Sequence, residues 1–335
     1  MRFPQPNPRV RVGLPTITIH RRFSSMPLAA DQPWHLAAVG APAAHDAGHR
    51  GNGVVVGVVD SGVDARHVQS TGLLAQVIAA KDFTSSRSAQ WDKLGHGTHV
   101  SGLVAQVAPR AKLLSAKALG DGGEGSDRAI AEAIAWCVSQ GSHVINLSLG
   151  SPSESPSISA AISAAISAGV TVVCASGNEG DRHVSWPASD NRTISVGALD
   201  RDQRPAAFSS PSSVDCAAPG VRVRSLYLDG GFAELSGTSM AAPIVTGLLA
   251  LFIGRDLANG VQLLPHVAML ARCRAASIDV GPTGPDRKTG AGLLSAEKWL
   301  EAVKPEPTDP PPTGKEQLEL LVGGRRFRWS AELVA

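Results

Sequence analysis

The stretch GVVVGVVDSG, residues 53–62, joins a run of valines directly to a carboxylate. Val54 to Val59 has the length and composition of a buried strand bounded by glycine. Similar apolar runs follow it along the chain, in alternation with alanine-rich helical stretches such as Asp127 to Gln140. Those runs are Lys112 to Ala118, Val144 to Leu149, Val170 to Ala175 and Thr193 to Ala198. The alternation predicts an α/β fold, a three-layer sandwich with a mainly parallel central sheet and helices on both faces.

Asp60 follows the first strand within Asp60-Ser61-Gly62. Ligands of such folds gather outside the carboxyl ends of the parallel strands, so this carboxylate has a favourable place for chemistry. Aspartate is also common in turns, where it serves only the backbone. Asp60 is therefore a candidate that needs partners elsewhere in the chain.

Two glycine-rich motifs supply candidate partners. His96 lies in Gly95-His-Gly-Thr-His99, at an expected helix start. His96 and His99 could also be read as zinc ligands, but the sequence around them lacks the further ligands that a zinc site would need. Ser239 lies in Ser236-Gly-Thr-Ser-Met-Ala-Ala-Pro243, at a turn into an apolar helix. A helix start favours negative charge, although a serine there by itself is commonly an N-cap.

Taken in chain order, Asp60, His96 and Ser239 with their flanking residues resemble the subtilisin family of serine peptidases over roughly residues 34–300. The resemblance implies that Ser239 is the nucleophile, His96 its base, and Asp60 the group that orients the imidazole; this order is the one known for subtilisin. It also implies that Asn178, in Ala175-Ser-Gly-Asn-Glu-Gly180, donates to the oxyanion with the Ser239 backbone N–H. A serine endopeptidase acting through an acyl-enzyme is expected.

The same resemblance assigns substrate-binding residues. Ser148, Leu149 and Gly150 would pair with an extended peptide as an added antiparallel strand. The walls and base of the specificity pocket would be Ala175, Ser176, Gly177 and Ser185. Large apolar side chains are expected to fit this pocket, and a basic one if Glu179 at its rim points inward.

No cofactor is expected to be required. The segment Leu103 to Pro109 is too short for the loop that holds a tight calcium ion in many family members. Asp215, with the carbonyl oxygens of Asn191 and Thr193, matches positions that hold a weaker cation in similar enzymes, so a weak Ca²⁺ or monovalent cation site is a hypothesis.

Composition limits the partners. The net charge is +2, and no basic run is interleaved with aromatics, so nucleic acid is not expected. The apolar run from Ala241 to Gly254 is too short to span a bilayer and predicts a core helix, so no membrane is expected. A peptide or protein substrate remains as the partner, and nothing indicates the oligomeric state.

The four scattered cysteines predict free buried thiols. The free cysteines, the lack of a recognisable signal peptide and the lack of a full prodomain together favour a cytoplasmic location and an intracellular processing role, while secretion stays open.

Four segments are expected: an N-terminal extension of low order (1–30), the peptidase domain (31–303), a proline-rich linker (304–314) and a hairpin-like tail (315–335). Two other functions stay open. One is a binding module that keeps the fold without catalysis, and the other is an esterase using the same nucleophile.

Overall fold

The structure, a computed structural model, describes residues 11–23, 33–64, 76–84, 92–180, 184–211, 214–302, 315–322 and 325–332. The chain divides into two units, Met1–Trp299 and Leu300–Ala335. In the second unit, β15 (Lys315–Val322) pairs antiparallel with β16 (Arg325–Glu332). The expected linker, 304–314, lies outside the described residues. All of the chemistry discussed below belongs to the first unit.

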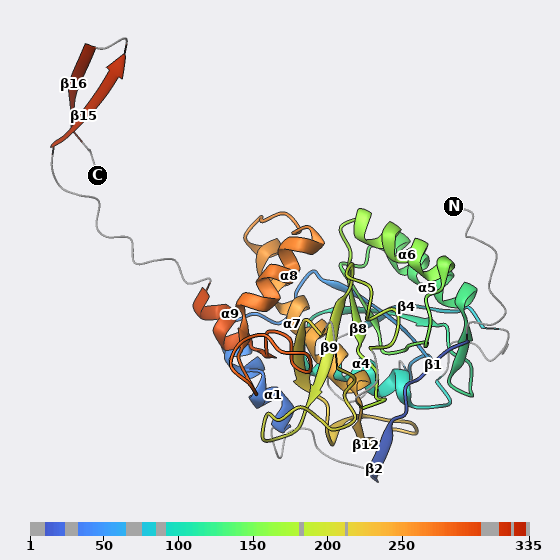
Figure 1. Cartoon of the computed structure of the whole chain (residues 1–335). Coiled ribbons are helices and arrows are strands. Elements are labelled where there is room, and N and C mark those ends of the chain that lie inside the picture. The colour runs from blue at the N-terminus through green and yellow to red at the C-terminus, as the bar shows by residue number, and fades with distance from the viewer. Residues whose placement is uncertain are drawn as a thin grey trace. The chain divides into compact units, whose positions relative to one another are not determined.

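A large sheet forms the centre of the first unit, in the order β13-β14-β10-β9-β8-β7-β3-β5-β4 (Figure 1). Its strands are β3 (Val55–Asp60), β4 (Gln76–Asp82), β5 (Lys112–Lys117), β7 (Val144–Leu147), β8 (Thr171–Ala175), β9 (Ile194–Leu199), β10 (Cys216–Pro219), β13 (Ser277–Ile278) and β14 (Leu293–Leu294). Every pair is parallel except β13 with β14. The five strands predicted from apolar runs are present, each within about two residues of its expected bounds.

Helices cover both faces of this sheet, as the predicted three-layer fold requires. On one face α4 (His96–Val107) packs against α7 (Thr238–Ala258), and on the other α5 (Asp127–Ser139) packs against α6 (Pro156–Ser167) (Figure 1). The shorter helices in the described residues are α1 (Trp34–Ala38), α2 (Ala41–Asp46), α8 (His266–Ala275) and α9 (Ala296–Ala302), the last of which runs past the end of the first unit at Trp299. The predicted fold class is confirmed.

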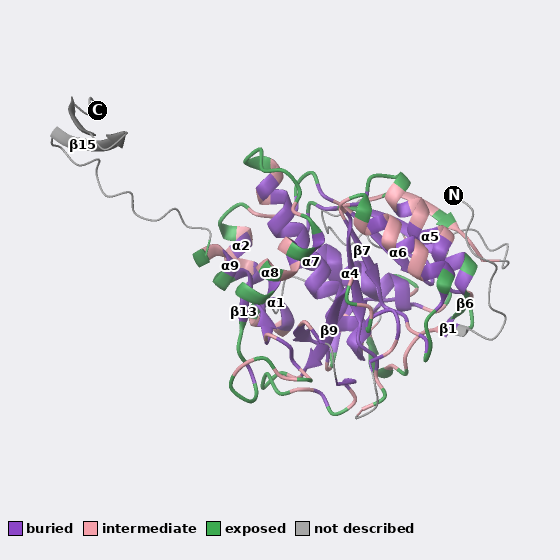
Figure 2. Ribbon diagram, turned by 45° about the horizontal axis from the view of Figure 1, so that its top comes forward, coloured by how far each residue is buried: buried purple, intermediate pink, exposed green. Residues whose placement is uncertain are grey.

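Helix α7 is the core helix of the molecule. Within the described residues it alone has the length and apolar composition of a membrane span, but 89% of its apolar window is buried inside the protein. Figure 2 shows it among the buried elements beside α4. Burial by protein on every side explains why its sequence is apolar all round.

The four cysteines are free and buried, in agreement with the prediction from sequence. Burial raises the pKa of both Cys137 and Cys273 to about 12, because an apolar interior disfavours the thiolate. These thiols therefore pack as small apolar side chains.

The described part of the N-terminal extension, residues 11–23, contains two strands, although low order was expected for residues 1–30. It includes β1 (Arg11–Gly13), paired antiparallel with β6 (Glu124–Ser126), and β2 (Thr18–Phe23). Strand β2 adds to the hairpin of β11 (Val223–Leu226) and β12 (Phe232–Ser236). The Val12 side chain is fully buried in the core. Strands β1 and β2 are ordered because each pairs with a strand more than 100 residues later in the chain, β6 and β12 respectively. The composition of the N-terminal segment does not reveal such pairing.

Candidate active site

The carboxylate of Asp60 and the imidazole of His96 meet at the edge of the sheet. Asp60 is the last residue of β3, and His96 is the first residue of α4. His96 Nδ1 lies 2.8 Å from Asp60 Oδ1 and 3.0 Å from Oδ2, and both side chains are buried. The Ser61 N–H also donates to Asp60 Oδ1, at 2.6 Å. A buried carboxylate thus fixes both the tautomer and the orientation of the ring.

Glycines on either side of His96 allow this close approach. A Cβ on Gly97 would lie 2.1 Å from the Gly62 carbonyl oxygen, in the loop that follows Asp60. Gly95 has φ +86°, and a Cβ there would meet the ring of Tyr227 at 2.4 Å. The Gly-His-Gly sequence is therefore needed to pack the helix start against the Asp60 loop.

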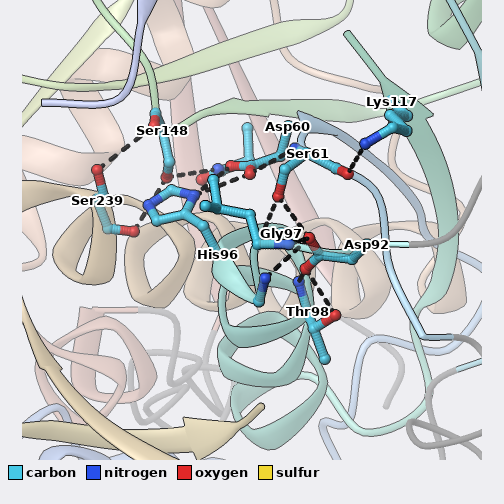
Figure 3. A network of polar contacts seen from close by, with 12 residues as sticks. Asp60, Ser61, Asp92, His96, Gly97, Thr98, Lys117, Ser148 and Ser239 are labelled. Carbon is cyan, nitrogen blue, oxygen red and sulfur yellow. Dashed lines mark hydrogen bonds and ion pairs between the residues drawn. The ribbon is translucent and has the colours of Figure 1, made fainter. Parts of the chain in front are cut away.

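Ser239 lies in the first turn of α7, and Figure 3 shows its side chain beside the His96 ring. Its hydroxyl donates to the Ser148 carbonyl oxygen at 3.4 Å, and Ser148 Oγ donates back to the Ser239 carbonyl oxygen at 3.0 Å. His96 Nε2 is buried and makes no hydrogen bond to a described residue. The fold brings the three predicted groups together, with the serine–histidine hydrogen bond not made in this arrangement.

The Asn178 side chain is held in one orientation. Its Oδ1 accepts from the N–H of Thr238 at 2.8 Å and from the Thr238 hydroxyl at 2.9 Å. Because the oxygen is engaged, the amide nitrogen faces the cleft, where it donates to the Thr16 carbonyl oxygen at 2.7 Å. Asn178 is a preorganised donor next to Ser239.

The chain's own N-terminal segment lies in the groove predicted to bind an extended peptide. Gly13 and Gly150 exchange both backbone hydrogen bonds, at 3.0 and 2.9 Å, and Leu14 N–H donates to the Gly123 carbonyl oxygen at 3.1 Å. The segment is therefore held between β6 and the predicted peptide-binding residue Gly150. We define residues 11–17 as the cleft segment.

A cavity of about 440 Å³ opens beside the cleft segment. Its lining includes Pro15, Gly150, Ser185 and Glu179. Glu179 Oε2 accepts from Ser185 Oγ at 3.3 Å and from Ser210 Oγ at 2.9 Å. The carboxylate therefore turns toward Ser185, the residue predicted at the pocket base.

The other predicted pocket residues lie at the neighbouring strand ends. Ala175 ends β8, and Ser176 follows it, bonded through its carbonyl to the Ser185 N–H. Gly177 has φ +109°, and a Cβ there would meet Glu179 Oε2 at 2.4 Å. The Leu149 side chain is buried in the core, so this residue can offer a substrate only its backbone.

His99 is a structural residue. Its Nε2 lies 3.1 Å from the Ala233 carbonyl oxygen, to which it donates. Complete burial lowers its pKa to about 3, so the ring is neutral at physiological pH.

At the hypothetical cation site, the oxygens of Asp215 already have internal partners. Oδ1 accepts from the Arg274 guanidinium at 3.1 Å, and Oδ2 accepts from the Ser195 N–H at 3.0 Å. Thr193 Oγ1 donates to the carbonyls of Pro187 and Asp190. A cation here would compete with Arg274, and the site stays a prediction.

Sequence reasoning overlooked two buried charged residues near the triad, Asp92 and Lys117. Asp92 accepts from Ser61 Oγ at 2.9 Å, and Lys117 Nζ donates to the Ser61 carbonyl oxygen at 2.8 Å (Figure 3). A lysine within the apolar run from Lys112 to Ala118 was the available signal, because a buried charge needs a specific partner.

Comparison with known proteins matches residues 51–292 to the Subtilase family of peptidases. This span includes all three motifs that meet at the edge of the sheet. The chain belongs to the subtilase family. It is a serine endopeptidase of the subtilisin type, as its similarity to named members indicates.

Named subtilases align over most of the first unit. Subtilisin Savinase of Lederbergia lenta is 39% identical over 280 residues, which cover 80% of this chain and 98% of that protein. An alkaline protease of Alkalihalobacillus alcalophilus is 38% identical over 281 residues, covering 81% and 70% of the two chains. Subtilisin BL of Lederbergia lenta is 38% identical over 280 residues, covering 80% and 98%.

Proposed function

We propose that this subtilase hydrolyses peptide bonds of proteins inside the cell, through an acyl-enzyme formed on Ser239. The observation that carries the proposal is the Thr16 carbonyl oxygen bound by Asn178, next to the Asp60–His96 pair. An extended peptide in the groove would present its scissile carbonyl at the same donor. The antiparallel pairing at Gly150 favours a peptide over a small ester, since backbone bonds on both sides of a residue recognise a strand.

In the proposed reaction, Ser239 Oγ turns from the Ser148 carbonyl to His96 Nε2 and gives its proton to that nitrogen as it attacks the carbonyl carbon. Asp60, bonded to Nδ1, stabilises the imidazolium that forms. His96 then returns the proton to the leaving amine, which frees the C-terminal product. A water molecule then attacks the ester carbonyl and gives a proton to His96. The bond between the acyl carbon and Ser239 Oγ breaks, the N-terminal product leaves as a carboxylic acid, and Ser239 Oγ takes the proton from His96.

Negative charge develops on the carbonyl oxygen during both steps. The Asn178 amide and the Ser239 backbone N–H would stabilise it, as known for the equivalent asparagine in subtilisin. Because Thr238 fixes the amide, this donor needs no reorganisation during attack. The proposed cycle needs no cofactor, and a weak structural cation at Asp215 stays a secondary hypothesis.

We also propose that the specificity pocket accepts a basic side chain as well as an apolar one. From the sequence, a basic side chain was expected to fit only if Glu179 points into the pocket. Its carboxylate accepts a hydrogen bond from Ser185, the residue predicted at the pocket base, which supports that orientation. A lysine or arginine preceding the scissile bond would gain a charge partner there. The carboxylate is exposed to solvent, so the gain is expected to be small.

Replacing Glu179 with glutamine should lower kcat/KM about 2- to 5-fold for a peptide with lysine before the scissile bond, the effect of one exposed ion pair. The same peptide with leucine at that position serves as the control and should be cut at an unchanged rate. An equal loss for both peptides would assign Glu179 to pocket shape instead of charge recognition.

The intracellular location rests on the free cysteines, which require no oxidising compartment. Fractionation of the producing cells, followed by immunoblotting, tests it. Protein found mainly in the culture medium would contradict it.

A serine-directed phosphonate tests the proposed chemistry most directly. We expect one covalent adduct, mapped by peptide mass spectrometry to Ser239, and parallel loss of protein hydrolysis. An adduct on another residue, or cleavage that survives complete labelling, would refute the proposal.

A further inference from the structure

Asp92 is a second buried carboxylate close to the triad, and it accepts five hydrogen bonds. Its Oδ1 accepts from Ser61 Oγ and from the N–H groups of Leu94 and Gly95, each at 2.9 Å. Its Oδ2 accepts from the N–H and the hydroxyl of Thr98, both at 2.8 Å. Asp92 thus joins the start of α4, which carries His96, to the residue that follows Asp60.

Ser61 Oγ completes this connection. It donates to Asp92 and accepts from the Gly97 N–H at 2.9 Å (Figure 3). Ser61 is the chain neighbour of Asp60, and Gly97 is the chain neighbour of His96. One buried hydroxyl therefore bridges the two backbone segments whose side chains form the carboxylate–imidazole pair.

Lys117 fixes the backbone carbonyl of Ser61. Its fully buried Nζ donates to the Ser61 carbonyl oxygen at 2.8 Å and lies 3.3 Å from Asp121 Oδ1. The Ser61 N–H is engaged by Asp60 Oδ1. With both backbone groups of Ser61 engaged, its hydroxyl is the group through which this residue bonds to the start of α4.

We propose that Asp92 is a positioning residue that acts through the Ser61 hydroxyl to set the geometry of the Asp60–His96 pair. Asp92 orients the Ser61 hydroxyl proton, which leaves an oxygen lone pair for the Gly97 N–H. This bridge holds α4 at the distance from which Nδ1 reaches both oxygens of Asp60. The kinetic part of the inference rests on the proposed function, whereas its structural part does not.

The test compares Ser61→Ala, Asp92→Asn and the double variant. Placed in a Ser239→Ala chain, each is examined by proton NMR for the low-field resonance of the proton between His96 Nδ1 and Asp60, which requires no turnover. We expect this signal to shift or broaden in both single variants. With Ser239 present, kcat should fall by up to about 100-fold, with KM changed less than twofold, because small misplacements of reacting groups are costly.

Action through Ser61 predicts that the double variant loses no more than the more damaged single variant, since coupled residues are not additive. The matched control is the Asp127–Ser155 pair on α5 and α6, where another buried carboxylate accepts from a serine hydroxyl at 3.1 Å. Asp127→Asn and Ser155→Ala should lower the melting temperature without moving the His96 resonance.

Several outcomes would overturn the inference. Ser61 and Asp92 variants that melt earlier but keep the parent resonance and kcat would show a purely structural role. Losses that add in the double variant would show that Asp92 does not act through Ser61. If the parent hydrolyses no peptide while the resonance still responds as expected, the proposed function fails and the positioning role survives.

Discussion

Replacing Ser239 with alanine is expected to reduce kcat for peptide hydrolysis about 10⁶-fold, the size of loss known for the nucleophile of subtilisin. The alanine chain keeps the Asp60–His96 pair and the Asn178 donor, but it has no oxygen able to form an acyl-enzyme. The measurement is the cleavage of a fluorogenic peptide by equal amounts of parent and variant, with melting temperatures compared to verify folding.

Ser139, an exposed serine at the end of α5, offers a matched control. Ser139→Ala should retain the parent rate. If the Ser239 variant kept more than about one hundredth of the parent activity, another nucleophile would be at work.

Replacing Gly13 with proline is expected to raise the rate at which a peptidyl phosphonate labels Ser239 by about tenfold. Gly13 exchanges two backbone hydrogen bonds with Gly150, and proline has no N–H to donate. A weakened cleft segment leaves the groove more often, so the peptide part of the reagent finds it free. The measurement is the second-order labelling rate of the full chain under identical conditions.

Thr18→Ala serves as the control, because Thr18 is an exposed residue of β2, outside the cleft segment, and alanine keeps its backbone bonds. Its labelling rate should equal that of the parent. A Gly13→Pro rate no higher than the parent rate would mean that the cleft segment does not limit access to Ser239.

The fold was predictable because its signals are local. Each apolar run is short and bounded by turn residues, and several of the runs alternate with helical stretches, so the sequence predicts parallel strands joined by crossovers. Asp60 could be placed at the carboxyl ends of the parallel strands for the same reason, whereas Asn178 was placed only through the family resemblance. The family motifs then gave each residue a role that spacing alone does not.

The cleft segment could not be predicted, because its order comes from edges more than 100 residues away in sequence. The proline-rich composition before residue 30 favours irregular structure, so low order was expected there. Pairing of β1 with β6 and of β2 with β12 outweighs that local tendency. Val12 adds an apolar side chain to a core that is otherwise remote in sequence.

The directions in which side chains point could not be predicted from the sequence either. Glu179 was placed at a pocket rim, but only the structure gives its hydrogen bonds to Ser185 and Ser210. The pairing of Asp215 with Arg274 joins residues 59 positions apart, and no motif links them. Asp92 resembled any other turn aspartate until its five donors were known.

The covalent link between the cleft segment and the rest of the chain has a kinetic consequence. A tethered occupant faces its site at an effective concentration on the order of millimolar, regardless of how far the protein is diluted. A free peptide must compete with that local concentration, so an apparent KM measured on the intact chain overstates the intrinsic one. The discrepancy should persist on dilution, unlike inhibition by a separate molecule.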